Sequence, residues 1–185
     1  MNRGFADVDD LFGALETSRD ADDEGGLSIL DHSLQCAELL RATRPDDVEL
    51  QVAGLVHDLG WLGRVPRGWT LRLDAAHDVD GRDLLGGLLG ERVARLVGGH
   101  VAAKRYLIAT EPGYAELLST RSEVTLEFQG GVMRGDEIVA FEQRPERDDL
   151  VVLRRADDAA KIRGKVVPGL DTWRAMVEGV ASAEE

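Results

Sequence analysis

The sequence predicts an all-α protein that forms a single domain. Apolar residues recur at helical spacing through most of the chain, and no segment shows the sustained alternation of apolar and polar residues that is typical of a strand. The breaks between helical segments carry glycine, proline or aspartate, which end helices or cap their beginnings. A chain of 185 residues with 43% hydrophobic content has the size and composition of one compact domain.

The first third of the chain predicts a short helix, a loop and a capped helix. Residues 5–17 place their apolar side chains on one helical face. The segment 18–26 is acidic and ends in two glycines, so we expect a mobile loop there. Ser28 can cap a helix that runs to Arg44, where Pro45 ends it.

The remaining elements follow from the same signals. Asp46 and Asp47 open a helix through Leu59, and residues 60–76 form a loop that bears glycine and proline. Segment 120–133 contains a turn signal, the Gln-Gly-Gly run. The other predicted helices are 80–89, 91–110, 114–118, 134–142, 147–162 and 169–182.

Charge and composition exclude several classes of protein. Acidic residues outnumber basic ones by 35 to 22, a net charge of −13, so the basic surface of a nucleic-acid-binding protein is not expected. No apolar run is long enough for a transmembrane helix, and the acid-rich beginning is not a signal peptide. Cys36, the single cysteine, cannot form an intrachain disulfide and is expected in the core. We therefore expect a cytoplasmic protein, with no particular oligomeric state indicated.

The histidines and one His-Asp pair form the strongest chemical signal. The chain has four histidines, His32, His57, His77 and His100, each in a different predicted segment, and Asp58 follows the second directly. Imidazole and carboxylate together suit iron, manganese or zinc. His32 and His57 lie within apolar helical runs, where burial without a partner would be costly. A single histidine is usually structural, but four in this order indicate a metal site. Asp58 has two oxygens, so it could bridge two metal ions.

Several longer motifs extend this pattern over residues 25–161. They are HSLQCA from His32, LVHDLG ending at Gly60, HVAAKRYL from His100, the QGG run at Gln129, and LRRADDAAK ending at Lys161. At these residues the chain resembles the HD-domain superfamily. More narrowly, it resembles the oxygenase branch that holds inositol oxygenase and the phosphonate-cleaving HD oxygenases. The resemblance implies one HD domain over 1–185, with an N-terminal helix and polar loop (1–26), a metal-binding core (27–162) and a C-terminal helix (163–185).

The resemblance also implies a cofactor, a reaction and a set of ligands. In that branch, a mixed-valent pair of irons activates dioxygen, and a C–P or C–C bond of the substrate is cleaved. By position, His32, His57, Asp58 and Asp157 would hold one iron. Asp58, His77 and His100 would hold the other, with Asp58 as the bridge.

Two cationic side chains are expected beside the metal ions. Lys104 lies four residues after His100, and Arg154 lies three residues before Asp157, so each shares a helical face with a candidate ligand. Both could bind a small phosphonate or carboxylate. As in the family, Ser122 and Gln129 would add neutral hydrogen bonds. Lys104, which holds the anion, and Asp58, the bridge, are the expected catalytic residues. Solvated ion pairs, and cap or turn roles for Ser122 and Gln129, are the alternatives.

The chain departs from the phosphonate-cleaving pattern around the substrate. A Tyr, a Glu and a Gln usually precede the first histidine, where this chain has Asp22, Gly25 and Ile29, although nearby Asp23 and Glu24 could substitute. Without that lid, we expect no protein side chain on the open position of the second iron. A family histidine four residues after His57 is replaced by Trp61. An apolar Trp wall would favour a substrate with hydrophobic or cationic character.

Two other functions remain compatible with the residues alone. A metal-dependent phosphohydrolase could use the same ligands, with Lys104 and Arg154 holding the phosphate of an ester. A binding or regulatory domain could hold the metal ions for structural reasons and catalyse no reaction. The leading hypothesis is a di-iron oxygenase that acts on a small hydroxylated phosphonate or a related anion.

Overall fold

A computed structural model describes residues 4–62 and 76–183. The helices are α1 (Val8–Thr17), α2 (Ile29–Thr43), α3 (Val48–Val56), α4 (His77–Val97), α5 (His100–Thr110), α6 (Thr120–Phe128), α7 (Asp136–Glu142), α8 (Arg147–Ala159) and α9 (Arg174–Ser182). Short 3-10 turns are η1 (Ser18–Asp20), η2 (Leu59–Trp61), η3 (Tyr114–Leu117) and η4 (Leu170–Trp173). The strands of the described residues are β1 (Asp22–Glu24) and β2 (Leu27–Ser28). The all-α prediction is confirmed.

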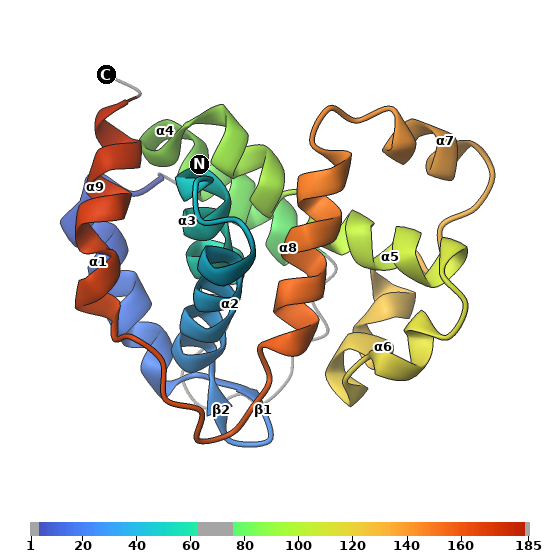
Figure 1. The fold of residues 1–185 in the computed structure, drawn as a ribbon, viewed down its shortest axis with the longest axis horizontal. Helices are drawn as coiled ribbons and strands as arrows, with labels where there is room; N and C mark the ends of the chain where they lie inside the picture. The colour runs from blue at the N-terminus through green and yellow to red at the C-terminus, as the bar shows by residue number, and fades with distance from the viewer. Residues whose placement is uncertain (1–3, 63–75, 184–185) are drawn as a thin grey trace.

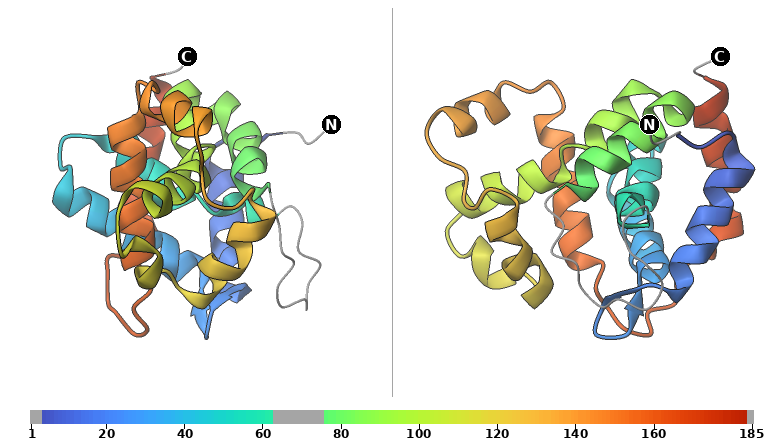
Figure 2. Two further views of the ribbon diagram at one scale, coloured as in Figure 1. Left: turned by 90° about the vertical axis from the view of Figure 1, so that its right-hand side faces the viewer. Right: turned by 180° about the vertical axis from the view of Figure 1, so that it is seen from behind.

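The helices form a bundle around α2 and α3, which pack closely against each other (Figure 1). Helix α8 packs against both and also against α5, while α1 and α9 cover the opposite side. Helices α5, α6 and α7 extend away from the bundle beyond α8, and the view from behind shows the same separation (Figure 2). The core contains leucines from most of these helices, including Leu30, Leu55 and Leu153, together with Trp173.

Side-chain caps fix where several helices begin. Ser28 accepts a hydrogen bond from the backbone N–H of Asp31 at 3.0 Å, and Asp47 accepts one from Leu50 at 3.1 Å. Each cap satisfies a backbone donor that the first turn of a helix leaves without a partner. Both helix starts therefore agree with the prediction, and α2 ends at Thr43, one residue before the predicted Arg44.

Segment 18–26 is more regular than the predicted loop. Its backbone forms the turn η1 and then strand β1, which pairs antiparallel with β2. Gly25 and Gly26 connect the strands with φ angles of 62° and 86°. A two-residue hairpin turn with positive φ at both positions favours glycine, which explains why these two residues form a turn here.

The observed bounds of α4 and α5 differ from the predicted helix bounds. Helix α4 begins at His77, inside the predicted loop, and its non-helical residue Gly90 marks the break expected between 89 and 91. The segment predicted as 91–110 divides again at Gly98 and Gly99, so that α5 begins at His100. The N-cap Gly99 has little room for a side chain, because an added Cβ would meet Leu150 at 2.6 Å.

Among the residues that the structure describes, no helix combines the length and the apolarity that crossing a bilayer requires.

Candidate metal centre

Three of the four histidines are oriented by backbone carbonyls. His32, His57 and His100 are buried, and the Nδ1 of each lies at hydrogen-bond distance from a carbonyl oxygen. The acceptors are Ala160 at 3.2 Å, Gly54 at 2.8 Å and Val97 at 2.7 Å. Because a carbonyl can only accept, the proton is on Nδ1, and Nε2 is left as the ligand atom.

The first candidate metal group joins helices α2 and α8 to the end of α3. It consists of His32, His57 and Asp157, all buried. The Nε2 atoms of His32 and His57 are 3.2 Å apart, and Oδ1 of Asp157 lies 3.2 Å from the first and 3.8 Å from the second. Three ligand atoms therefore converge on one point from three elements that are distant in sequence.

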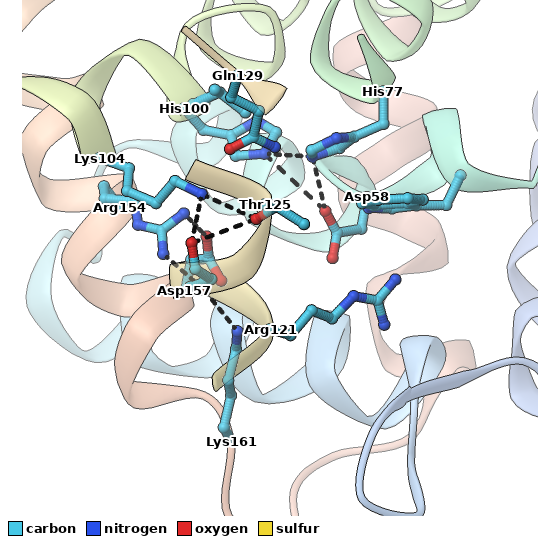
Figure 3. A pocket seen from close by; sticks show the side chains of 13 residues that line it. Asp58, His77, His100, Lys104, Arg121, Thr125, Gln129, Arg154, Asp157 and Lys161 are labelled. Carbon is cyan, nitrogen blue, oxygen red and sulfur yellow. Dashed lines mark hydrogen bonds and ion pairs between the residues drawn. The ribbon is translucent and has the colours of Figure 1, made fainter. Parts of the chain in front are cut away.

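The second candidate group lies beside the first. It consists of Asp58, His77 and His100, which are also buried and come from the turn after α3 and from the first residues of α4 and α5. The two imidazole Nε2 atoms are 3.0 Å apart. Oδ1 of Asp58 lies 3.6 Å from Nε2 of His77 and 3.9 Å from Nε2 of His100 (Figure 3).

Asp58 joins the two groups through its two oxygens. Oδ1 faces His77 and His100, whereas Oδ2 lies 3.6 Å from Nε2 of both His32 and His57. One carboxylate can thus contribute an oxygen to each of two metal ions. The bridge that the sequence predicts is geometrically available, and all six predicted ligands belong to one or the other group.

The donor set fits metal ions better than protons. Nitrogen lone pairs at 3.0–3.2 Å repel one another unless a cation lies between them. Burial lowers the pKa of His77 to about 3, and the neighbouring His100 acts in the same direction. Burial also disfavours charge on His57, but the carboxylates of Asp58 and Asp157 outweigh it and raise its pKa to about 9. The two carboxylates require positive charge that the four imidazoles cannot all supply as protons.

Gly60 allows the two ligand-bearing turns to approach each other. Helix α3 ends at Val56, and His57, Asp58 and the turn η2 follow. A Cβ on Gly60 would lie 1.9 Å from the carbonyl oxygen of His77. Glycine at this position therefore lets the first turn of α4 pack against the His-Asp turn, which brings His77 beside Asp58.

The predicted anion-binding residues line a small cavity beside the second group. Its volume is about 30 Å³, and Lys104, Ser122, Gln129 and Arg154 all contribute to its wall. The Lys104 ammonium is buried and donates to the carbonyl oxygen of Ser122 at 3.1 Å and to Oγ1 of Thr125 at 3.2 Å. Burial, followed by the charge of Arg154, lowers the pKa of Lys104 to about 7. An anion bound beside Lys104 would stabilise its ammonium form and so raise this pKa again.

Arg154 is held in place by acidic and hydroxyl groups. Its guanidinium contacts Asp157 at 2.9 Å and Asp158 more closely, and Nη2 donates to Oγ of Ser122 at 3.3 Å. The hydroxyl of Tyr114 in turn donates to Asp158. Arg154 therefore faces both the first metal group and the cavity, as its spacing from Asp157 predicts.

Gln129 offers the cavity an unsatisfied acceptor. It is buried, and its Oε1 has no hydrogen-bond partner among the described residues. A buried amide oxygen without a partner is costly, so a ligand with a hydroxyl or protonated oxygen would be favoured here.

Trp61 lines the cavity as expected but is not an open aromatic wall. Its ring stacks on His77, with centroids 4.4 Å apart and an interplanar angle of 20°. The guanidinium of Arg121 lies 4.7 Å from the centroid of the same ring. The expectation that this wall would favour a substrate with hydrophobic or cationic character stays a prediction, and such a substrate would meet an indole that already contacts His77 and Arg121.

The sequence reasoning missed four residues of the cavity wall. Val101, on α5, Arg121 and Thr125, on α6, and Lys161, after α8, also line it. Lys161 donates to the hydroxyls of Ser119 and Ser122 at 3.3 and 3.4 Å. Thr125 lies three residues after Ser122, a helical spacing that could have extended the predicted site. The side chains of Asp22, Asp23 and Glu24, on which the lid prediction depends, lie outside the described residues.

Comparisons with known proteins show which family the chain belongs to. No protein-family model matches the chain. The hydroxymethylphosphonate dioxygenase of Gimesia maris is 33% identical over 174 residues, which cover 92% of this chain and 86% of that protein. The 1-hydroxy-2-(trimethylamino)ethylphosphonate dioxygenase (glycine-betaine-forming) of Leisingera caerulea is 29% identical over 177 residues, 94% of this chain and 88% of that protein. An uncharacterized protein of Acanthamoeba polyphaga mimivirus is 30% identical over 150 residues, 78% of this chain and 68% of that protein.

The two relatives with a named activity are both dioxygenases, which favours the oxygenase hypothesis over the phosphohydrolase alternative. The first matches this chain along nearly the whole sequence, across both candidate metal groups. The chain belongs to the HD-domain di-iron oxygenases, the family that its motifs resemble.

Proposed function

We propose that this protein is a di-iron oxygenase that uses dioxygen to cleave the C–P bond of a small 1-hydroxyphosphonate. One observation carries the proposal: the two oxygens of Asp58 face two separate groups of ligands, directly beside a cavity lined with cations. The names of the relatives supply the reaction class, since both act on a hydroxylated phosphonate with dioxygen.

The proposed ligand set follows the two geometric groups. His32, His57 and Asp157 would hold one iron, His77 and His100 would hold the other, and Asp58 would bind both. When bound, the iron pair, in a mixed-valent Fe(II)/Fe(III) state, would supply the site for dioxygen and for the hydroxyl of the substrate. The protein's part is to orient the imidazoles through their Nδ1 protons and to hold the substrate beside them.

The cations of the cavity would bind the phosphonate. Lys104 and Arg154 would supply charged donors, Ser122 a hydroxyl and Gln129 its amide. Because Lys104 is buried and has only neutral oxygen partners among its hydrogen bonds, a dianionic phosphonate would gain more there than at an exposed lysine. Lys104 and Asp58 are thus the proposed catalytic residues, the first by contact with the substrate and the second by contact with both irons.

The overall reaction balances without a further reductant. A substrate R–CH(OH)–PO₃²⁻ and O₂ would give R–COO⁻, HPO₄²⁻ and H⁺. The C–P bond breaks, the carbon is oxidised to a carboxylate, and dioxygen is reduced as its two atoms enter the products. With R as hydrogen, hydroxymethylphosphonate would give formate and phosphate.

The test measures phosphate release and dioxygen consumption together. Iron-loaded protein is mixed with hydroxymethylphosphonate in air and, separately, under nitrogen. The proposal predicts phosphate only in air, with one dioxygen consumed for each phosphate released. Phosphate release from a phosphate ester at equal rates in air and under nitrogen, with no turnover of the phosphonate, would instead establish a phosphohydrolase.

A further inference from the structure

Lys161 reaches the cavity from a segment that is neither helix nor strand. Helix α8 ends at Ala159, and residues 160–169 connect it to η4. The Lys161 ammonium lines the cavity (Figure 3) and donates to the hydroxyls of Ser119 and Ser122 at 3.3 and 3.4 Å. Hydrogen bonds of this length are weak, so they alone do not fix the ammonium. Where Lys161 lies therefore depends on how its backbone is held.

Gln35 of α2 holds that backbone through both ends of its side-chain amide. Its Nε2 donates to the carbonyl oxygen of Ile162 at 2.9 Å, and its Oε1 accepts from the Ile162 N–H at 3.1 Å. The two bonds resemble the pair that residues of neighbouring strands exchange. The Lys165 N–H also donates to the Ile162 carbonyl, at 3.3 Å, but that bond lies within the segment. Gln35 thus ties the residue after Lys161 to the bundle.

The same face of α2 also contacts the residue before Lys161. His32 lies one helical turn before Gln35, and its Nδ1 is 3.2 Å from the carbonyl oxygen of Ala160. Helix α2 therefore holds the backbone on both sides of Lys161, while the hydroxyls at the start of α6 contact the end of its side chain. The segment that carries a cation of the cavity also carries the carbonyl that orients a candidate metal ligand.

We propose that Gln35 is a positioning residue for anion binding, which acts on the substrate through Lys161. Its amide fixes the backbone of 160–162, so that the Lys161 ammonium is presented to the phosphonate together with Lys104 and Arg154. Without the two hydrogen bonds, the segment would have to be ordered when the anion binds, and that entropic cost would weaken the affinity. The inference rests on the proposed function, because it takes the phosphonate to bind in this cavity.

The test is a double-mutant cycle on anion affinity. Dissociation constants of iron-loaded protein for hydroxymethylphosphonate and for sulfate are measured by calorimetry under nitrogen, with the iron content of each variant determined alongside. Gln35→Met removes both hydrogen bonds at nearly constant volume, and Lys161→Met removes the ammonium. We expect Lys161→Met to weaken binding about tenfold, and Gln35→Met about three- to tenfold. In the Lys161→Met background, Gln35→Met should weaken binding by less than about twofold, because its effect passes through Lys161.

Gln51 provides a matched control in the same bundle. Gln35 and Gln51 are both 1% exposed, and Nε2 of Gln51 donates to the carbonyl oxygens of Arg44 and Pro45 at 2.8 and 3.1 Å, outside the cavity. Gln51→Met should lower the free energy of unfolding, as Gln35→Met does, and leave both dissociation constants unchanged. In turnover of hydroxymethylphosphonate in air, Gln35→Met should raise KM and change kcat by less than about twofold, whereas Gln51→Met should change neither.

Hydrogen exchange of the wild-type protein provides a test that does not require Gln35→Met to fold. Because coupling between two sites is reciprocal, an anion that is bound through Lys161 must also stabilise the backbone on which Lys161 depends. Saturating sulfate should therefore slow exchange of the Ile162 amide by about threefold or more. The same addition should have no such effect in Lys161→Met.

The inference would be overturned by equal affinities in Gln35→Met and wild type, by additive losses in the double variant, or by an Ile162 amide whose exchange does not respond to sulfate. Failure of the proposed function would look different. Wild-type protein would then not bind hydroxymethylphosphonate, and sulfate binding that still depends on Gln35 and Lys161 would support the positioning role alone.

Discussion

At the scale of single residues, the site depends on how Arg154 is held. The guanidinium is almost fully buried, and Asp157 and Asp158 balance its charge. Burial and then the charge of Asp158 raise the pKa of Tyr114, so its hydroxyl keeps its proton and donates to Asp158. Tyr114 thus acts on the cavity through Asp158 and Arg154, as a positioning residue.

Replacing Tyr114 with phenylalanine should loosen that arrangement. The Asp158 carboxylate loses one donor, Arg154 gains freedom, and the dissociation constant for inorganic phosphate should rise about three- to tenfold, as expected for the loss of one hydrogen bond. Metal content should not change. Tyr106→Phe is the matched control, since that hydroxyl donates to Glu142 at an exposed site. Equal phosphate affinity in Tyr114→Phe and wild type would show that Asp158 holds Arg154 without help.

The lowered pKa of Lys104 predicts a pH dependence of anion binding. Burial and Arg154 bring that pKa to about 7, so the ammonium is present below pH 7 and is lost as the pH rises through 7. Sulfate is a suitable probe because it does not titrate in this range. Its affinity for protein prepared without metal should fall by about tenfold or more between pH 6 and pH 9, since a hydrogen bond from a charged donor is lost.

Lys104→Met should have weak sulfate binding at both pH values, with metal content intact. A wild-type affinity that stays constant over this range would mean that Lys104 does not titrate there or does not contact the anion.

The sequence predicted the candidate ligands more completely than the cavity wall. The four histidines and Asp58 stood out because imidazole and carboxylate have few other reasons to be buried together, and the family resemblance added Asp157. The surroundings of Trp61 were not predictable, because they include Arg121, which is far away in sequence and reaches the ring only through the placement of α6.

At the scale of elements, the site is assembled by the ends of helices. His77 and His100 are the first residues of α4 and α5, and His57 and Asp58 follow the end of α3. Of the six candidate ligands, only His32 and Asp157 lie in the interior of a helix. The relative placement of these ends therefore determines the geometry of the candidate metal groups, and at Gly60 two of them pack without room for a Cβ.

Gly60→Ala should separate the His-Asp turn from α4. The added Cβ would meet the His77 carbonyl at 1.9 Å, so the backbone must shift and His77 must move away from Asp58. We expect loss of the second metal ion, measured by elemental analysis, and a stability loss of about 1–3 kcal/mol from overpacking. Gly87→Ala, in an exposed part of α4 with nothing within 4 Å of the new Cβ, should keep both metals and be neutral or stabilising. Equal metal content in the two variants would contradict this role for Gly60.

Helix starts were predictable where a capping side chain is local, as at Ser28 and Asp47. The hairpin of β1 and β2 was not predictable from periodicity, because strands of two and three residues are too short to show an alternating pattern. Its turn signal, Gly25-Gly26, was present, and a hairpin rather than a loop would have been the better prediction.

At the scale of the whole molecule, Arg92 links three helices outside the site. From α4, it contacts Asp47 at 2.7 Å and Glu49 at 3.0 Å, at the start of α3, and Asp149 of α8 at 2.9 Å. Its charge keeps three carboxylates together in a strongly acidic chain. A network of this kind contributes more than an isolated surface ion pair.

Arg92→Leu should leave those carboxylates without a counter-charge. We expect the free energy of unfolding to fall by about 1–2 kcal/mol at low salt, and by less in high salt, where repulsion is screened. Denaturant unfolding of Arg92→Leu and of Arg82→Leu, which removes only an exposed pair with Asp83, gives the comparison. Equal stability of the two variants would show that the network contributes nothing.

Asp58 is proposed to hold two irons in one site. The direct measurement is the iron content of anaerobically purified protein, by elemental analysis together with paramagnetic resonance, in wild type and in Asp58→Ala. We expect two irons per chain in the wild-type protein. In the variant we expect neither iron site to be fully occupied, because each group loses its shared ligand. Asp78→Ala, which removes a buried carboxylate outside both groups, should retain two. A wild-type protein with a single iron, or an Asp58→Ala variant that keeps one full equivalent, would contradict the bridge.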